Sequence, residues 1–295
     1  MKRIVAILLV LAMALCFSGC AGVKEYLWPT PTTAAPAKPT SNLTIVPGWS
    51  IVQIAEKLEE LDICPADEFL KAAKVVPPGY DQLVDGLGSA DGYLFAAEGF
   101  IIPETHNIYQ NSSPENVLVF LLNYSQKKLN ELTFNDTTAY ARAEQLGMSM
   151  YEVFTLASII QYEANLGSTD KDFDIMQQVS SVFHNRLSDP YGRYTYLGSD
   201  ATRKYIEVKM KKYIEANNLD YDKYFEGYCT NDGYDLKTAG LPVGPVGAPS
   251  LTAIMAALWP ADTNYYFFFT DADNNFHFYT NYEDFQYEWN NIYKH

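Results

Sequence analysis

The chain is short of the residues that build metal sites. Its 295 residues include only 4 cysteines and 4 histidines, the histidines stand singly, and no CxxC pair occurs. Zinc and iron–sulfur sites are typically built from clusters of these residues at short spacing. We therefore expect no metal, and nothing else in the sequence indicates a cofactor.

Positive charge is also scarce. The sequence has 21 Lys and Arg against 36 Asp and Glu, which gives a net charge of −15. A surface of this sign is repelled by nucleic acid and by anionic lipid, so nucleic acid is excluded as a partner. Neutral or weakly charged glycans fit better, because 23 tyrosines and 4 tryptophans supply flat faces that can stack on sugar rings. The 48% of hydrophobic residues is enough for the core of one large domain or two modest ones.

The N-terminus carries a targeting signal. Lys2-Arg3 precedes an apolar run, Ile4 to Phe17, that is too short for an ordinary membrane-spanning helix. Small residues then lead directly to Cys20, as in a bacterial lipoprotein signal. We predict a signal peptide over residues 1–19 and lipidation of Cys20; an uncleaved anchor helix is the alternative. Either one holds the protein at the extracytoplasmic face of the cell membrane, and cleavage takes the net charge from −15 to −17.

Residues 20–42 read as a tether. The segment contains PTPTTAAPAKPT, which lacks apolar periodicity and favours an extended chain. Of the cysteines beyond it, Cys64 and Cys229 are far apart in sequence, and both a disulfide and two separate buried thiols are open.

Ordered structure is expected from Leu43. LTIVPG, residues 43–48, reads as a short strand. Ser50 is expected to cap a helix with apolar residues at helical spacing to Leu61, and a second helix is expected over Ala66 to Ala73. This strand–helix–helix order resembles the LysM-like subdomains of cell-wall proteins, which are glycan-binding units. With the loop-rich segment that follows, we assign residues 43–100 to a LysM-like subdomain and bridge.

Residues 101–295 are expected to form a mixed α+β domain, so the whole chain is assigned to the α+β class. Apolar spacing predicts helices over Pro114–Leu132, Thr137–Leu146 and Asp172–Leu187, and a further helix that starts at Ser149. The aromatic runs on both sides of residues 271–275 predict a hairpin.

Glu163 is the most unusual carboxylate in the sequence. In LASIIQYEAN it falls at the edge of the apolar stripe of the helix that starts at Ser149, beside Leu156. Glu152 has a simpler role, because Ser149-Met-Tyr-Glu152 is a capping box. Burial disfavours the charged form of a carboxyl group, so the pKa of Glu163 should rise towards neutrality and suit it to donate a proton. A glutamate that reaches from the helix edge to water is the alternative.

Several motifs occur in a fixed order along the chain. ASIIQYEA is followed by VSSVFHNRLS, YLGSDAT and GLPVGPVGAPSLTAIMAALWPADTNYYFFF, and preceded by TIVPGWSIVQIAEKL and EGFIIPETHNI. Together they resemble the endolytic murein transglycosylases, the MltG (YceG-like) family, over Leu43 to Tyr293. In that family the catalytic glutamate lies in the motif that corresponds to ASIIQYEA, and Glu163 occupies its position in this chain. Gln161 stands at an earlier position of the same motif that is sometimes acidic.

The resemblance implies an activity. Such an enzyme cuts the β-1,4 bond between N-acetylmuramic acid and N-acetylglucosamine in nascent glycan strands and leaves 1,6-anhydro ends. Glu163 would act as acid and then as base, and neither water nor a cofactor takes part. Peptidoglycan strands are the implied substrate, and peptidoglycan synthases are further expected partners.

Other residues are candidates for substrate binding. Ser199 and Asp200 match the family's Ser-Asp motif, although an Asx-type turn explains them equally well. Asn185 and Arg186 end a helix, where Arg186 could instead serve the helix carbonyls. His277 is a candidate for a place in the cleft, or else a half-exposed strand residue.

The chain departs from the family pattern at three places. Ala201 replaces a common proline, His184 a common aromatic residue, and the segment 233–237 matches a YNTY motif poorly. Two other functions therefore stay open. One is a hydrolytic muramidase with Asp200 as its second carboxylate, and the other is a non-catalytic lipoprotein that binds the cell wall.

Overall fold

The computed structural model describes residues 38–89, 92–164 and 170–293. The predicted signal peptide, Cys20 and the tether as far as residue 37 lie outside these residues. Within the described part of the chain, no helix is both long enough and apolar enough to cross a bilayer.

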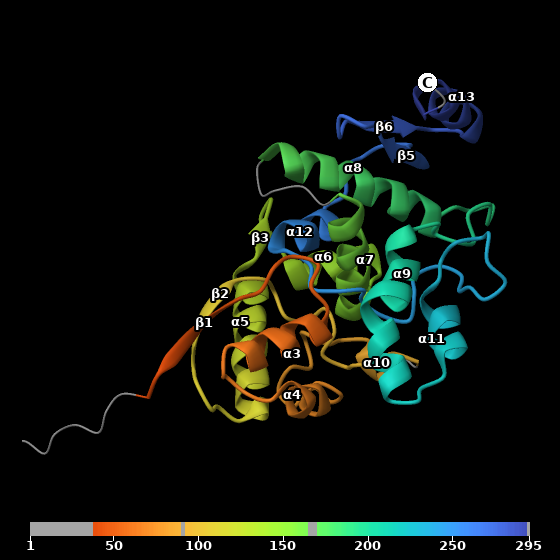
Figure 1. Cartoon of the computed structure of the whole chain (residues 1–295). Coiled ribbons are helices and arrows are strands. Elements are labelled where there is room, and N and C mark those ends of the chain that lie inside the picture. Colours follow the sequence, from red (N-terminus) through yellow and green to blue (C-terminus); the bar gives the residue numbers. More distant parts are fainter. Residues whose placement is uncertain (1–37, 90–91, 165–169, 294–295) are drawn as a thin grey trace, which may run out of the picture. The chain divides into compact units, whose positions relative to one another are not determined.

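The structure is a largely helical α+β fold, which confirms the predicted class (Figure 1). Its described elements, in chain order, are β1 (Thr40–Thr44), α3 (Ile51–Glu60), α4 (Ala66–Ala72), the 3-10 helix η1 (Leu87–Ser89), β2 (Thr105–Tyr109), α5 (Pro114–Glu131), β3 (Thr133–Phe134), β4 (Thr137–Thr138), α6 (Ala139–Leu146), α7 (Met150–Glu163), α8 (Asp170–Leu187), α9 (Asp200–Lys204), the π-helix η2 (Tyr205–Met210), α10 (Lys211–Ala216), α11 (Tyr221–Tyr228), α12 (Leu251–Leu258), β5 (Phe267–Thr270), β6 (Phe276–Tyr279) and α13 (Tyr282–Tyr293).

The first elements follow the predicted order of one strand and two helices. Ser50 caps α3 in a full capping box with Gln53. Strand β1 starts at Thr40, inside the predicted tether, because its backbone pairs in antiparallel register with β2 from Thr40↔Tyr109 to Thr44↔Thr105. Strand β2, for which no strand was predicted, lies beyond the boundary drawn at residue 100. Residues Thr40–His295 form one compact unit, and the likeness of its first part to LysM stays a prediction.

A buried carboxyl group joins this first part to η2. Glu98 is 2% exposed, and its two oxygens accept hydrogen bonds from the backbone N–H of Ile51, at 3.1 Å each, and from the hydroxyl of Tyr205, at 2.8 Å. The ammonium of Lys209 donates to the carbonyls of Gly48 and Val246. Segments far apart in the sequence are therefore fixed against one another by hydrogen bonds to charged groups, which are stronger than neutral ones.

Helix α7 lies at the centre of the fold. Helices α12, α8, α6 and α9 all pack against it, and Figure 1 shows it surrounded by them. Ser149 and Glu152 form the predicted capping box. From Met150 to Gln161 every residue except Glu152 is buried, so this helix is enclosed on almost every side and lacks the polar face that an amphipathic helix has.

The predicted hairpin near the C-terminus is confirmed. Strands β5 and β6 pair with Phe269 opposite His277. In the turn between them, the Asp271 carboxylate accepts hydrogen bonds from the backbone N–H groups of Asp273 and Asn275. Helix α13, which the sequence analysis did not predict, packs on both strands.

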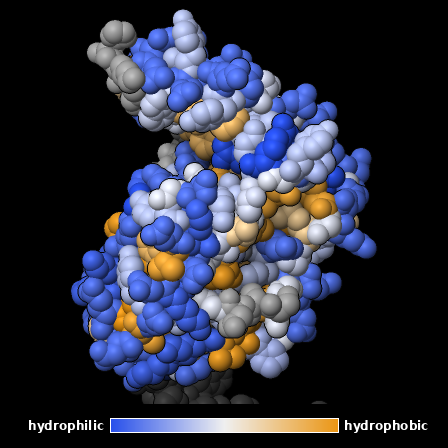
Figure 2. Space-filling view, turned by 90° about the vertical axis from the view of Figure 1, so that its right-hand side faces the viewer, coloured by the Kyte–Doolittle hydropathy of each residue, from blue (hydrophilic) through white to orange (hydrophobic). Residues whose placement is uncertain are grey.

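Neither of the cysteines among the described residues forms a disulfide. Cys64 and Cys229 are buried free thiols, which is the second of the two alternatives left open above. Burial raises the pKa of Cys64 to about 11, which keeps it in the unreactive protonated form. The face that Figure 2 shows is mostly hydrophilic, with apolar residues in separate areas.

Candidate functional site

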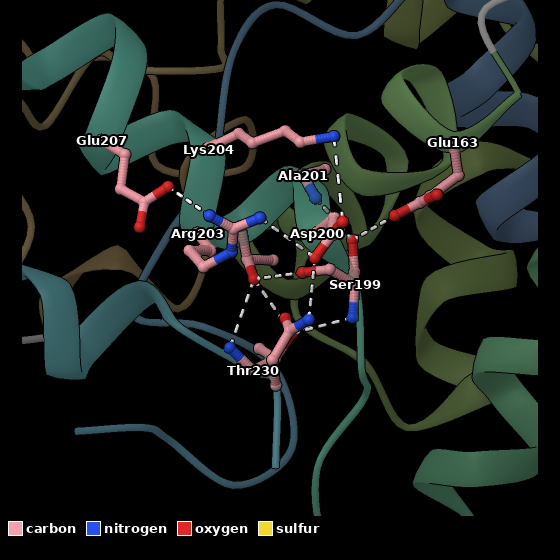
Figure 3. A network of polar contacts seen from close by, with 10 residues as sticks. Glu163, Ser199, Asp200, Ala201, Arg203, Lys204, Glu207 and Thr230 are labelled. Atoms are coloured by element: carbon pink, nitrogen blue, oxygen red, sulfur yellow. Dashed lines mark hydrogen bonds and ion pairs between the residues drawn. The ribbon is translucent and has the colours of Figure 1, made fainter. Parts of the chain in front are cut away.

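Glu163 is the last residue of α7, and its side chain is not directed into open solvent. The side chain is half-buried, and its Oε1 accepts a hydrogen bond from the Ser199 hydroxyl at 2.5 Å (Figure 3). Ser199 itself is only 2% exposed. The glutamate singled out from the sequence is thus held in one orientation by one of the other candidate residues.

The position of Ser199 is fixed by its surroundings. It is the N-cap of α9, and its hydroxyl oxygen accepts a hydrogen bond from the backbone N–H of Ala201. Its own N–H donates to Thr230 Oγ1 at 3.2 Å, and its carbonyl accepts from the Thr202 hydroxyl at 2.7 Å. Every neighbour that holds this serine is itself buried, so the hydroxyl is presented to Glu163 with little freedom.

The environment of Glu163 raises its pKa above the ordinary value for glutamate. Burial is the largest cause, and the negative charge of Asp200 acts in the same direction. The Ser199 hydroxyl, the Ala201 N–H and the Lys204 ammonium act in the opposite direction because they stabilise the carboxylate. Such a group can hold a proton closer to neutral pH than an ordinary glutamate and is still stabilised after it has lost it.

Asp200 differs from Glu163 in both exposure and partners. Its side chain is 53% exposed. Its carboxylate accepts a hydrogen bond from Asn231 at 2.9 Å and lies 3.4 Å from Arg203 and 3.8 Å from Lys204. Asp200 thus opens α9 with its charge partly neutralised, and its contact with substrate stays a prediction.

The segment that contains GLPVGP is attached to α7 by three hydrogen bonds. The Tyr151 hydroxyl donates to the carbonyl of Val243 at 2.6 Å. The other two bonds run from the backbone N–H of Val246 to Ser158 Oγ, at 2.9 Å, and from the N–H of Ser250 to Gln161 Oε1, at 3.0 Å. Gln161, at the position that is sometimes acidic, therefore has a structural contact at the start of α12.

Gly244 explains one feature of this motif. A Cβ at this position would lie 2.4 Å from the Tyr151 hydroxyl and 3.3 Å from that of Tyr228. Only glycine leaves room for the backbone to approach these tyrosines so closely.

Asn185 and Arg186 hold the chain that leads into β5. The Asn185 amide donates to the carbonyls of Thr263 and Tyr265, at 2.9 Å each. Arg186 donates to the carbonyl of Tyr266 at 2.8 Å and to that of Leu197. Burial lowers the pKa of Arg186 to about 10, against the charge of Glu163, which raises it. Both side chains serve backbone carbonyls of other segments, and a role in substrate binding stays a prediction.

His277 belongs to the hairpin. Its Nε2 lies 2.8 Å from Asp271 Oδ2, and its ring stacks on Phe269 with the centroids 5.0 Å apart. Within the described part of the chain, no hydrogen bond, ion pair or ring contact connects it to Glu163. A place for His277 in a substrate cleft therefore rests on the sequence pattern alone.

Sequence reasoning missed part of this site. Thr230, Thr202 and the N–H of Ala201 all contact Ser199 or Glu163, yet no pattern marks them. The Ala201 contact also gives meaning to a departure from the family pattern, because a proline at this position has no N–H to donate. No group of three or more metal-ligating side chains occurs among the described residues.

The chain is similar to known proteins over most of its length. The model of the YceG-like family matches residues 30–291. The chain belongs to the YceG-like family. A Streptococcus pneumoniae protein named endolytic murein transglycosylase is 25% identical over 269 residues, which are 84% of this chain and 44% of that protein. A Bacillus subtilis protein of the same name is 26% identical over 176 residues, 60% of this chain and 42% of that one.

This YceG-like chain spans less than half the length of those relatives. The fold is also similar to the crystal structure of a YceG-like protein from Listeria monocytogenes, with a TM-score of 0.62 and 21% identity over 84% of this chain and 75% of that one. At that identity the likeness concerns the fold alone.

Proposed function

We propose that this chain is an endolytic lytic transglycosylase of peptidoglycan. The observation that carries the proposal is the half-buried Glu163. Its carboxylate accepts a hydrogen bond from the Ser199 hydroxyl, and its pKa is raised by burial. The names of the two relatives support the substrate class. A reaction that needs one carboxyl group fits this site better than one that needs two.

In the proposed reaction Glu163 first donates its proton to the oxygen between N-acetylmuramic acid and N-acetylglucosamine. The glycosidic C–O bond breaks, and the 2-acetamido group of the substrate supports the positive charge that develops at the anomeric carbon. The ionised Glu163, stabilised by Ser199, then takes the proton from the muramyl 6-hydroxyl as its oxygen bonds to that carbon. The product is a 1,6-anhydro end, the proton is returned to Glu163, and no water is consumed.

The proposal extends to the place of action. With Cys20 lipidated and residues 20–42 as a tether, the enzyme acts on nascent strands at the extracytoplasmic face of the cell membrane. The synthases that make those strands are the expected partners.

The decisive experiment compares two glutamates on one helix. Glu163→Gln removes the proton donor and should leave no detectable 1,6-anhydro ends when uncrosslinked glycan strands are digested and analysed by mass spectrometry. Glu152→Gln, which keeps a capping amide at the start of α7, should cleave as the unmodified protein does. Substantial cleavage by folded Glu163→Gln would overturn the assignment.

The same digest tests a second function, hydrolysis with Asp200 as the base. The charge of Asp200 does influence Glu163, but its carboxylate is engaged by Asn231, Arg203 and Lys204. Hydrolysis leaves ends that are heavier than anhydro ends by one water, and Asp200→Asn would then abolish cleavage. Binding of strands without any new ends would favour a non-catalytic wall-binding protein.

A further inference from the structure

A large cavity lies away from Glu163. It has a volume of about 720 Å³ and is formed by α3 and α4 together with η2 and α10. Its size is in the range of ligand sites. Its exposed lysines have no role in the proposed reaction. We name it the α3–α10 groove, and its lining includes Val52, Gln53, Glu56, Leu70, Lys74, Val208, Lys209 and Lys212.

Opposite charges line the α3–α10 groove. Helix α3 contributes Glu56 and Glu59, α10 contributes Lys212, and Lys74 follows the end of α4. Asp67 and Lys71 of α4 pair with each other at 2.9 Å, and the ammonium of Lys209 donates to backbone carbonyls. Among the described residues, no ion pair connects α3 with η2 or α10. Lys74, Lys212 and Glu56 form no ion pair with any described residue, so each can meet an opposite charge of a ligand.

The groove also has apolar surface between its charges. Val52 and Leu70 are partly buried against the core, and Val208 is 71% exposed. Apolar contact with a few well-placed charged groups is the usual composition of a site for a small ligand.

The groove adjoins a second cavity next to the catalytic helix. That cavity, of about 310 Å³, shares Gln53 and Lys209 with it and is also lined by Trp49 and Tyr162. Tyr162 directly precedes Glu163 in α7. A ligand in the α3–α10 groove can therefore be part of the same polymer that reaches Glu163.

We propose that the α3–α10 groove binds the short peptides attached to peptidoglycan strands, which carry free carboxylates and an amino group. Lys74 and Lys212 meet the peptide carboxylates, and Glu56 with Glu59 meet the amino group. The glycan chain itself is uncharged and would make no use of these residues. The inference rests on the proposed function, because it assumes a peptidoglycan substrate.

A binding experiment tests the groove without cleavage. The probe is a synthetic pentapeptide with one lysine side chain and a free C-terminal carboxylate, titrated into the full chain carrying Glu163→Gln. We expect saturable binding that weakens about fivefold in the added double variant Lys74→Ala/Lys212→Ala, the effect of two exposed ion pairs. Adding Lys127→Ala instead, on α5 outside the groove, should change nothing. Lys74 and Lys212 are exposed, so the double variant should fold.

Modified probes identify the ligand chemistry. A peptide with an amidated C-terminus and an acetylated side chain should bind at least about fivefold more weakly than the unmodified one. Equal binding of both peptides, or no effect of the lysine double variant, overturns the proposal.

Turnover separates this inference from the proposed function. For strands that carry peptides, Lys74→Ala/Lys212→Ala should raise KM several-fold, while strands stripped of peptides should be cleaved as before. If the unmodified protein cleaves, and the KM of the variant equals that of the unmodified protein on each of the two substrates, the groove proposal fails and the proposed function stands. If unmodified protein produces no anhydro ends, the proposed function fails, and the peptide titration still reports on the groove.

Discussion

At the scale of single residues, Ser199 controls the acidity of Glu163. Its hydroxyl lowers a pKa that burial raises, because it donates to the ionised form. Ser199→Ala should therefore raise the pKa of Glu163 further. The alkaline limb of the pH–rate profile, where the proton needed for the first step is lost, should move to higher pH.

The maximal rate of Ser199→Ala should fall about tenfold or more, because the ionised glutamate loses a charge-assisted hydrogen bond. Ser199→Thr keeps the hydroxyl and is the matched control. If the alkaline limb of the pH–rate profile does not move in Ser199→Ala, Ser199 does not set the pKa of Glu163.

The backbone at residue 201 makes a second contribution. The Ala201 N–H lowers the pKa of Glu163, and a proline lacks that donor. Residue 201 lies in the first turn of α9, where helices tolerate proline. Ala201→Pro should fold and shift the alkaline limb in the same direction as Ser199→Ala, by a smaller amount. Ala201→Gly, which retains the N–H, should leave the limb in place.

The contacts of Glu163 were predictable only in part. Helical geometry placed it at the edge of an apolar stripe. The motif order marked Ser199 and Asp200 as candidates for substrate binding, and the hydrogen bond from Ser199 to Glu163 was not predicted. Thr230 lies 31 residues from Ser199 in sequence, and a contact at that separation is set by packing rather than by local pattern. Arg186 was expected to serve helix ends or substrate, and it serves carbonyls of two other segments.

At the scale of elements, the sequence predicted the helices from α3 to α8, where apolar spacing is regular, and missed those from α9 to α13. The capped helices α3 and α7 begin at the predicted N-caps because capping is a local interaction. Strand β2 was missed because five residues carry little pattern, and its stability depends on β1 across 61 or more residues. The turns of α9, η2 and α10 form against buried partners such as Glu98.

The π-helix η2 has an identifiable purpose among these elements. It directs Tyr205, whose hydroxyl binds Glu98, and Lys209, whose ammonium binds the carbonyls of Gly48 and Val246, to the same interior region. π-Helical turns occur often at functional sites.

The close approach of the GLPVGP segment to α7 yields a prediction. Gly244→Ala places a methyl group 2.4 Å from the Tyr151 hydroxyl, so it should lower the free energy of unfolding by about 1–3 kcal/mol. Adding Tyr151→Phe removes the clashing oxygen, and the double variant should lose less than the sum of the two single variants. Gly233→Ala, which meets no atom within 4 Å, is the control. Strict additivity in urea unfolding would show that the two residues do not clash.

At the scale of the whole molecule, buried Glu98 makes folding sensitive to pH. Burial raises its pKa to about 7, from the 4.5 of an exposed glutamate. Between these pH values the folded chain holds a proton that the unfolded chain has released, so stability falls as pH rises. Burial also lowers the pKa of Lys209 to about 8 from 10.5, so between those values stability rises with pH.

The measurement is urea unfolding at pH 5 and pH 7.5. The unmodified chain should lose about 1–3 kcal/mol from Glu98 between them, and Glu163 contributes in the same direction. Glu98→Gln removes the ionisable group and should flatten this dependence, even if it lowers stability at both pH values. An undiminished slope in Glu98→Gln would mean that Glu98 binds its proton equally in the folded and unfolded chains and does not cause the pH dependence.

The position of Glu163 as the final residue of α7 has a further consequence. The unpaired carbonyl groups at the end of a helix give that end a partial negative charge of roughly half a unit. A carboxylate there is repelled by the backbone itself, which favours the protonated form before any side chain is considered. The place where this helix stops is therefore part of its chemistry: one more helical turn would move that negative end away from the carboxyl group and weaken it as a proton carrier.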